Sequence, residues 1–143
     1  MTDLSLEKIS KKLFLVTTYL ILALPLFFLK NVLRPYILGK MIPFQVLVLI
    51  LLAIWVFLLL FDFKKYRPRF NLLTLALTIF IFSIFLSAIF GKNFYRSFWG
   101  NAERMEGFIN IFHFYLFTLA LASVFQEKEI WRKLIFFSLV ISF

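Results

Sequence analysis

Apolar residues gather into five long runs separated by short polar segments. The runs cover residues 13–29, 42–61, 72–90, 108–125 and 130–143. A helix needs roughly 20 apolar residues to cross about 30 Å of hydrocarbon, and the first four runs approach that length. The fifth, at about 21 Å of helix, is too short. The pattern predicts an all-α, polytopic transmembrane helix bundle with four full spans and the start of a fifth, cut from a longer membrane domain.

The first apolar run follows a polar N-terminal segment, residues 1–12. A basic start before an apolar centre resembles a signal peptide. However, the run is longer than a typical signal core, no small-residue cleavage site follows it, and further spans come after. We therefore expect a retained first span, kinked or ended by Pro25.

Helix ends are indicated by individual residues. Pro43 suits the first turn of the second span, where its missing N–H costs little. Asn71 is expected to cap the start of the third span and Gly91 its end. Ser83 and Ser87 lie one turn apart and predict a face packed closely on another helix.

Lysine and arginine side chains set the expected orientation, because cytoplasmic loops of membrane proteins carry an excess of them. With a cytoplasmic N-terminus, ten cations lie inside and six outside, and residues 91–107 face outward. The inside set is Lys8, Lys11, Lys12, Lys64, Lys65, Arg67, Arg69, Lys128, Arg132 and Lys133; the outside set is Lys30, Arg34, Lys40, Lys92, Arg96 and Arg104.

Composition supports the membrane interpretation. The chain is 63% hydrophobic and 16% charged, far from the roughly 45–50% apolar and about 25% charged make-up of soluble domains. Its net charge of +9 is spread over short clusters between the apolar runs, which argues against a nucleic-acid surface. There is no cysteine and one histidine, so thiolate sites and a histidine-rich metal cluster are excluded, and we expect no metal or cofactor.

The polar segment 91–107, GKNFYRSFWGNAERMEG, is the main candidate for chemistry. Its aromatic residues are suited to headgroup depth. Arg96 and Arg104 could each pair two donors with a lipid-linked pyrophosphate, or simply contact lipid headgroups or other loops. Glu103 and Glu106, three residues apart, are either an acid and base pair or first-turn acids of the next helix.

A second candidate is the polar pair Asn110 and His113, which share one face of the predicted fourth span. Ionisable residues inside membrane helices often carry protons or contact substrate. The alternative is a neutral histidine that is hydrogen-bonded to Asn110 or to a neighbouring helix.

The residues FGKNFYRSFWGNAERMEGF, with LFDFKKYRPRFN before them and LFTLALASVF after, resemble the N-terminal part of O-antigen ligase and polymerase membrane proteins. The resemblance covers roughly residues 30–125. It implies a bacterial-type inner-membrane enzyme of about a dozen helices. Such an enzyme transfers glycan from a polyprenyl-pyrophosphate carrier to a glycan, lipid or protein acceptor at the outer face, without nucleotide sugar.

The resemblance places the family's catalytic arginine and histidine residues in a larger outer loop further along, so His113 is not equated with that histidine. We therefore expect this segment to be inactive alone and its catalytic residues to lie elsewhere. The alternative is a small polytopic transporter or a structural scaffold.

Overall fold

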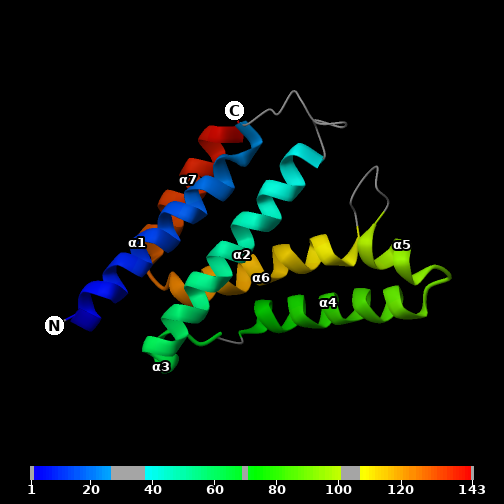
Figure 1. Ribbon diagram of the computed structural model, residues 1–143, viewed down its shortest axis with the longest axis horizontal. Helices are drawn as coiled ribbons and strands as arrows, with labels where there is room; N and C mark the ends of the chain where they lie inside the picture. The colour runs from blue at the N-terminus through cyan, green and yellow to red at the C-terminus, as the bar shows by residue number, and fades with distance from the viewer. Residues whose placement is uncertain (1, 27–37, 69–70, 101–106, 143) are drawn as a thin grey trace.

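The structure is a computed structural model that describes residues 2–26, 38–68, 71–100 and 107–142 (Figure 1). Within these residues every regular element is helical and there is no strand, which confirms the all-α prediction. The elements are α1 (Thr2–Ala23), a 3-10 turn η1 (Leu24–Leu26), α2 (Leu38–Phe61), α3 (Phe63–Tyr66), α4 (Leu72–Phe90), α5 (Phe94–Trp99), α6 (Phe108–Val124) and α7 (Lys128–Ser142).

Three of the described helices are long and apolar enough to cross a membrane: Ser5–Leu26, Lys40–Phe61 and Leu72–Phe90. Helix α6 is apolar but has 17 residues, and α7 has 15. At 1.5 Å per residue, α6 reaches roughly 25 Å, somewhat less than a typical hydrocarbon core. Three candidate spans therefore indicate a membrane protein, whereas the fourth and fifth spans stay predictions.

Helix α1 begins at Thr2, well before the first apolar run. Its polar part contains good helix formers, and Glu7 pairs with Lys11 one turn later at 3.6 Å. At its other end the regular helix stops at Ala23 and continues as the 3-10 turn that contains Pro25. The predicted effect of Pro25 is thus confirmed.

Helix α2 also begins before its apolar run, at Leu38. Pro43 consequently lies inside the helix, and the prediction that it occupies the first turn was wrong. A proline at this position removes one backbone donor, which the helix tolerates because the break is confined to its second turn.

Helix α4 has the predicted ends. The Asn71 side chain accepts from the backbone N–H of Thr74 at 3.0 Å, and the Thr74 hydroxyl accepts from the N–H of Asn71 at 2.8 Å, which forms a capping box. Gly91 is the C-cap. The expected packing face was wrong, because Ser83 and Ser87 are exposed and the buried residues of α4 are Thr74, Ile81 and Ala88.

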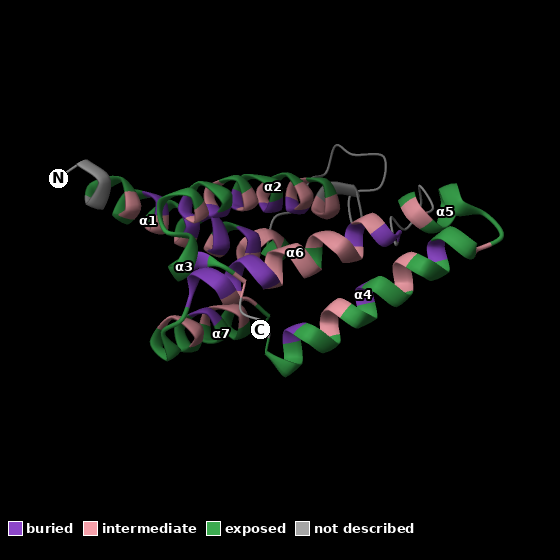
Figure 2. Cartoon of the chain, turned by 90° about the horizontal axis from the view of Figure 1, so that it is seen from below, coloured by how far each residue is buried: buried purple, intermediate pink, exposed green. Residues whose placement is uncertain are grey.

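The helices bury two separate apolar clusters. Figure 2 shows most of the buried residues on α1, α2 and α6, with few on α4. The larger lies among α1, α2, α6 and α7 and includes the fully buried Phe14, Val48 and Leu51. The smaller lies between α4, α5 and α6 around Ile81 and Phe108. Helix α6 contributes to both clusters, so it joins the group of α1, α2 and α7 to the pair of α4 and α5. In Figure 1, α4 and α6 are inclined to α1, α2 and α7.

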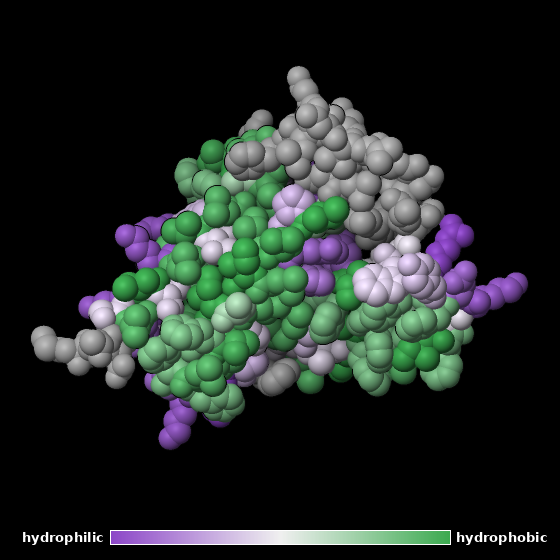
Figure 3. Space-filling view, viewed as in Figure 1, coloured by the Kyte–Doolittle hydropathy of each residue, from purple (hydrophilic) through white to green (hydrophobic). Residues whose placement is uncertain are grey.

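Most of the surface of the candidate spans is apolar and uncovered. Between 17% and 33% of each span is buried inside the structure. Figure 3 shows apolar residues over most of the described face, with strongly hydrophilic residues towards its ends and in one patch near its centre. A surface of this kind suits helices that face lipid.

Candidate functional site

The described part of the predicted polar segment, residues 91–100 and Gly107, forms a short helix and a sharp corner. The side chain of Asn93 caps α5 by accepting from the backbone N–H of Arg96 at 3.2 Å. The helix ends at Gly100, whose backbone has φ 82° and ψ 176°. This region is essentially open to glycine alone, so Gly100 is required for the chain to leave α5 in this direction.

Gly107 closes the same corner from the start of α6. A Cβ atom placed on Gly107 would clash with backbone atoms of Phe98, Trp99 and Gly100. Gly107 and the end of α5 are therefore held together by direct backbone packing. We refer to residues 93–100 with Gly107 as the α5 corner.

An aromatic cluster fixes the α5 corner on its neighbours. The Phe98 ring lies 5.6 Å from that of Phe108 at the start of α6, and Phe108 lies 5.2 Å from Phe85 of α4. Tyr95 and Trp99 are left 72% and 53% exposed. The corner thus has a buried aromatic anchor and an exposed aromatic rim, as expected for a segment at the membrane surface.

The predicted donor contacts lie at this rim or outside the described residues. The Arg96 side chain is exposed, and it makes no ion pair or hydrogen bond with any residue that the structure describes. Arg104, Glu103 and Glu106 lie outside the described residues. Arg96 is therefore open to an external anion.

The polar pair of α6, Asn110 and His113, is not joined by a hydrogen bond in the described structure. Asn110 is 5% exposed, and its Oδ1 has no hydrogen-bond partner among the described residues. Nδ1 of His113 lies 2.7 Å from the carbonyl oxygen of Ile109, so Nδ1 carries a proton and donates within the helix. This does not match the alternative in which His113 bonds to Asn110. An unpartnered buried carbonyl is costly, and a water or ligand donor would relieve that cost.

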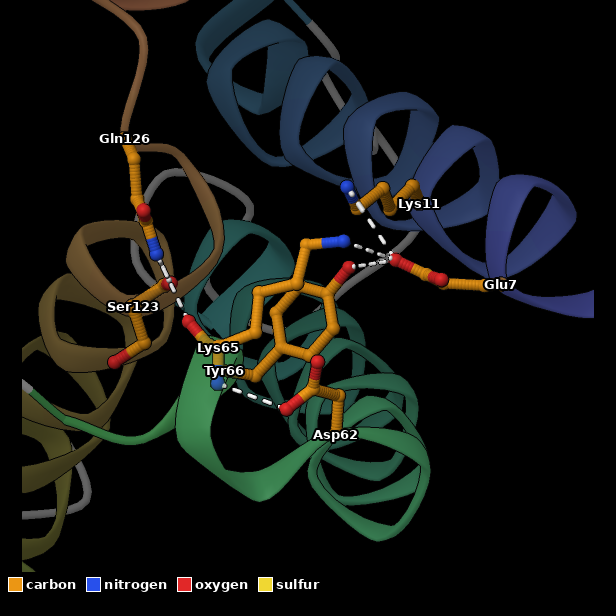
Figure 4. A network of polar contacts seen from close by, with 7 residues as sticks. All are labelled: Glu7, Lys11, Asp62, Lys65, Tyr66, Ser123 and Gln126. Carbon is orange, nitrogen blue, oxygen red and sulfur yellow. Dashed lines mark hydrogen bonds and ion pairs between the residues drawn. The ribbon is translucent and has the colours of Figure 1, made fainter. Parts of the chain in front are cut away.

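Sequence reasoning missed a polar cluster at the opposite end of the molecule (Figure 4). Glu7 of α1 accepts from the Nζ of Lys65 at 2.7 Å and from the hydroxyl of Tyr66 at 2.5 Å. The Nζ atoms of Lys11 and Lys65 each lie 5.4 Å from the centroid of the Tyr66 ring. The cluster ties α1 to α3 across 58 residues of sequence.

Neighbouring backbone contacts complete this cluster. The indole N–H of Trp55 donates to the Tyr66 carbonyl at 3.1 Å, and the amide of Gln126 donates to the Lys65 carbonyl at 2.8 Å. The last two carbonyls of α3 are thus bonded by α2 and by the connection between α6 and α7. Lys65 and Tyr66, in a segment expected only to set topology, thus form a junction of α1, α2, α3 and the connection between α6 and α7.

The electrostatics of the cluster follow from its geometry. Burial of Tyr66, reinforced by its hydrogen bond to Glu7, raises the pKa of the phenol to about 12. The hydrogen bond to Glu7 also raises the pKa of Lys65. Both effects favour the protonated donors that the contacts require.

The described residues contain no group of three histidine, aspartate or glutamate side chains placed to hold a metal ion. The two ends of the molecule therefore offer different chemistry: an exposed arginine with an aromatic rim at the α5 corner, and a lysine-rich junction around α3. No known protein family, curated protein or solved structure matches the chain.

Proposed function

We propose that this chain is the N-terminal membrane portion of a glycan ligase or polymerase of the O-antigen type. The enzyme would transfer glycan from a polyprenyl-pyrophosphate carrier to an acceptor at the outer face of the membrane. The observation that carries the proposal is the α5 corner, which presents Arg96, exposed and without a partner among the described residues, beside exposed aromatic rings.

The distribution of charge supports an outward α5 corner. The described cations at the α3 end are Lys8, Lys11, Lys12, Lys64, Lys65, Arg67, Lys128, Arg132 and Lys133, whereas those at the other end are Lys40, Lys92 and Arg96. By the positive-inside rule, this distribution favours a cytoplasmic α3 end. An outward site meets lipid-linked sugars and not nucleotide sugars.

In this proposal Arg96 binds the pyrophosphate of the donor. A guanidinium offers paired N–H donors that match phosphate oxygens, and the aromatic rim places it at headgroup depth. The buried Asn110 would accept a hydrogen bond close to the same corner. The groups that break and form glycosidic bonds would come from sequence beyond these helices.

Glycan transfer by the full-length protein tests the role of Arg96. Arg96→Ala should reduce transfer by about tenfold or more, the effect of losing one charged hydrogen-bonding group. Lys92→Ala, an exposed cation just before the same helix, should retain activity. Equal activity of Arg96→Ala and the unaltered protein, at equal membrane levels, would refute the donor contact.

A deletion strain tests the enzyme class. Loss of the gene should leave glycan accumulated on its lipid carrier. Normal glycan with altered solute flux would instead favour the transporter alternative.

Labelling tests the orientation. Single cysteines at Ser97 and Lys64, both exposed, should react with a membrane-impermeant reagent from the outer and inner sides respectively. The reverse labelling would remove the argument for a lipid-linked donor.

A further inference from the structure

A cavity of about 410 Å³ lies beside the polar cluster, between α1, α3 and the connection from α6 to α7. Its polar rim consists of Lys11, Lys12, Lys65, Tyr66, Gln126 and Glu127. Its apolar wall consists of Leu15, Val124, Phe125 and Ile130. The lining of the cavity therefore combines charged and apolar side chains.

The division within the cavity coincides with the division along the sequence. On α1, Lys11 and Lys12 end the polar N-terminal segment, and Leu15 lies in the apolar run that follows. On the other side of the cavity, Phe125 ends an apolar run and Gln126 begins a polar break. Both elements thus change between charged and apolar residues beside the same cavity, a change that is typical of headgroup depth in membrane proteins.

The charge of the rim favours an anion. Three lysines line the cavity against one carboxylate, Glu127. Glu7, just behind them, is shared by two of these lysines, with its Oε1 at 2.7 Å from Lys65 and 3.6 Å from Lys11. Lys12 has no acidic partner in the part of the chain that the structure describes. Its ammonium is therefore available to a ligand.

We propose that this cavity binds the headgroup phosphate of an anionic phospholipid. Lys12 contacts the phosphate directly, while Lys11 and Lys65, held over the Tyr66 ring, supply positive potential. One acyl chain lies against Leu15 and Ile130. Basic pockets between membrane helices are suited to such headgroups. The inference does not depend on glycan transfer, so either proposal can fail without the other.

The test measures the tryptophan fluorescence of the full chain in detergent micelles that contain brominated lipids, which quench this fluorescence. Trp131 is the reporter, because its indole N–H donates at 2.9 Å to the carbonyl oxygen of Phe125 in the cavity wall. Trp99→Phe removes the exposed indole on α5, and Trp55 is 8% exposed. Quenching by brominated phosphatidylglycerol is compared with quenching by brominated phosphatidylcholine.

With all lysines unaltered, we expect brominated phosphatidylglycerol to quench Trp131 more strongly than brominated phosphatidylcholine does. Lys12→Gln should weaken that preference about fivefold, the contribution of one lysine near an anionic surface. Lys64→Gln is the matched control, since it removes the same charge from the same end but does not line the cavity. It should change the preference by less than about twofold. Circular dichroism should show that both variants remain folded.

Three results would overturn the proposal. One is the absence of any preference for phosphatidylglycerol. Another is an equal loss in the Lys12→Gln and Lys64→Gln variants, which would mean diffuse surface attraction. The third is displacement of the lipid by inorganic phosphate at constant ionic strength, which would assign the cavity to a soluble phosphate.

Discussion

Replacing Tyr66 with phenylalanine isolates one contact of the polar cluster. The substitution keeps the buried ring, which is 1% exposed, and removes only the hydroxyl that donates to Glu7 at 2.5 Å. A hydrogen bond to a charged acceptor contributes about 1.5–3 kcal/mol. The Glu7 side chain is 22% exposed, so water partly replaces the lost donor. We therefore expect a loss of about 1.5–2 kcal/mol.

Equilibrium unfolding in mixed detergent micelles, followed by circular dichroism, measures this loss. Tyr95→Phe is the control, because it removes the same atom from a residue that is 72% exposed and should change stability by less than about 0.5 kcal/mol. A double-mutant cycle with Glu7→Gln should assign most of the loss to the pair. If Tyr66→Phe is as stable as the unaltered chain, the cluster does not hold α1 to α3.

The pH dependence of the same measurement gives an independent check. The pKa of Tyr66 is about 12 in the folded chain against 10.0 ordinarily. A raised pKa means that folding favours the protonated phenol, so its contribution is complete below about pH 10 and is lost as the pH rises through about 12. Lys65, whose pKa is also raised, acts in the same direction. The stability of the unaltered chain should fall across this window, and that of Tyr66→Phe should fall less.

Three further predictions concern single residues. Gly107→Ala should destabilise the α5 corner by about 1–3 kcal/mol through its backbone clash, seen as faster hydrogen exchange in α5, whereas Gly91→Ala should have a smaller effect. Asn71→Ala should lower helix stability by about 1 kcal/mol through loss of the capping box, measured by thermal unfolding, with Ser83→Ala near neutral. Trp55→Phe should cost about 1 kcal/mol in micelle unfolding, because it leaves the Tyr66 carbonyl without its indole donor.

Helix positions were predictable where the sequence carries a terminator as well as an apolar run. Asn71 and Gly91 bound α4, and the observed helix matches the predicted one. Helices α1 and α2 begin earlier than their apolar runs. Hydropathy indicates which residues lie in hydrocarbon, but a helix can extend beyond them into water.

The candidate sites were predictable only where their signals are local. The glycines and aromatic residues of the α5 corner are visible within one segment, although the clash that makes Gly107 necessary is not. The bonds from Glu7 to Lys65 and Tyr66 join residues 58 and 59 positions apart. No periodicity or motif in the sequence links such positions, because contacts between them depend on how α1 and α2 pack in three dimensions.

The packing order of the helices has a consequence for biosynthesis. Helices α1 and α2 are neighbours in sequence and pack on each other, so they can associate as soon as both have been made. The main partners of α4 are α5 and α6, which are made after it. During synthesis α4 must therefore enter the bilayer through its own hydrophobicity, before α6 is available to pack on it. This order fits the nearly unbroken apolar surface of α4.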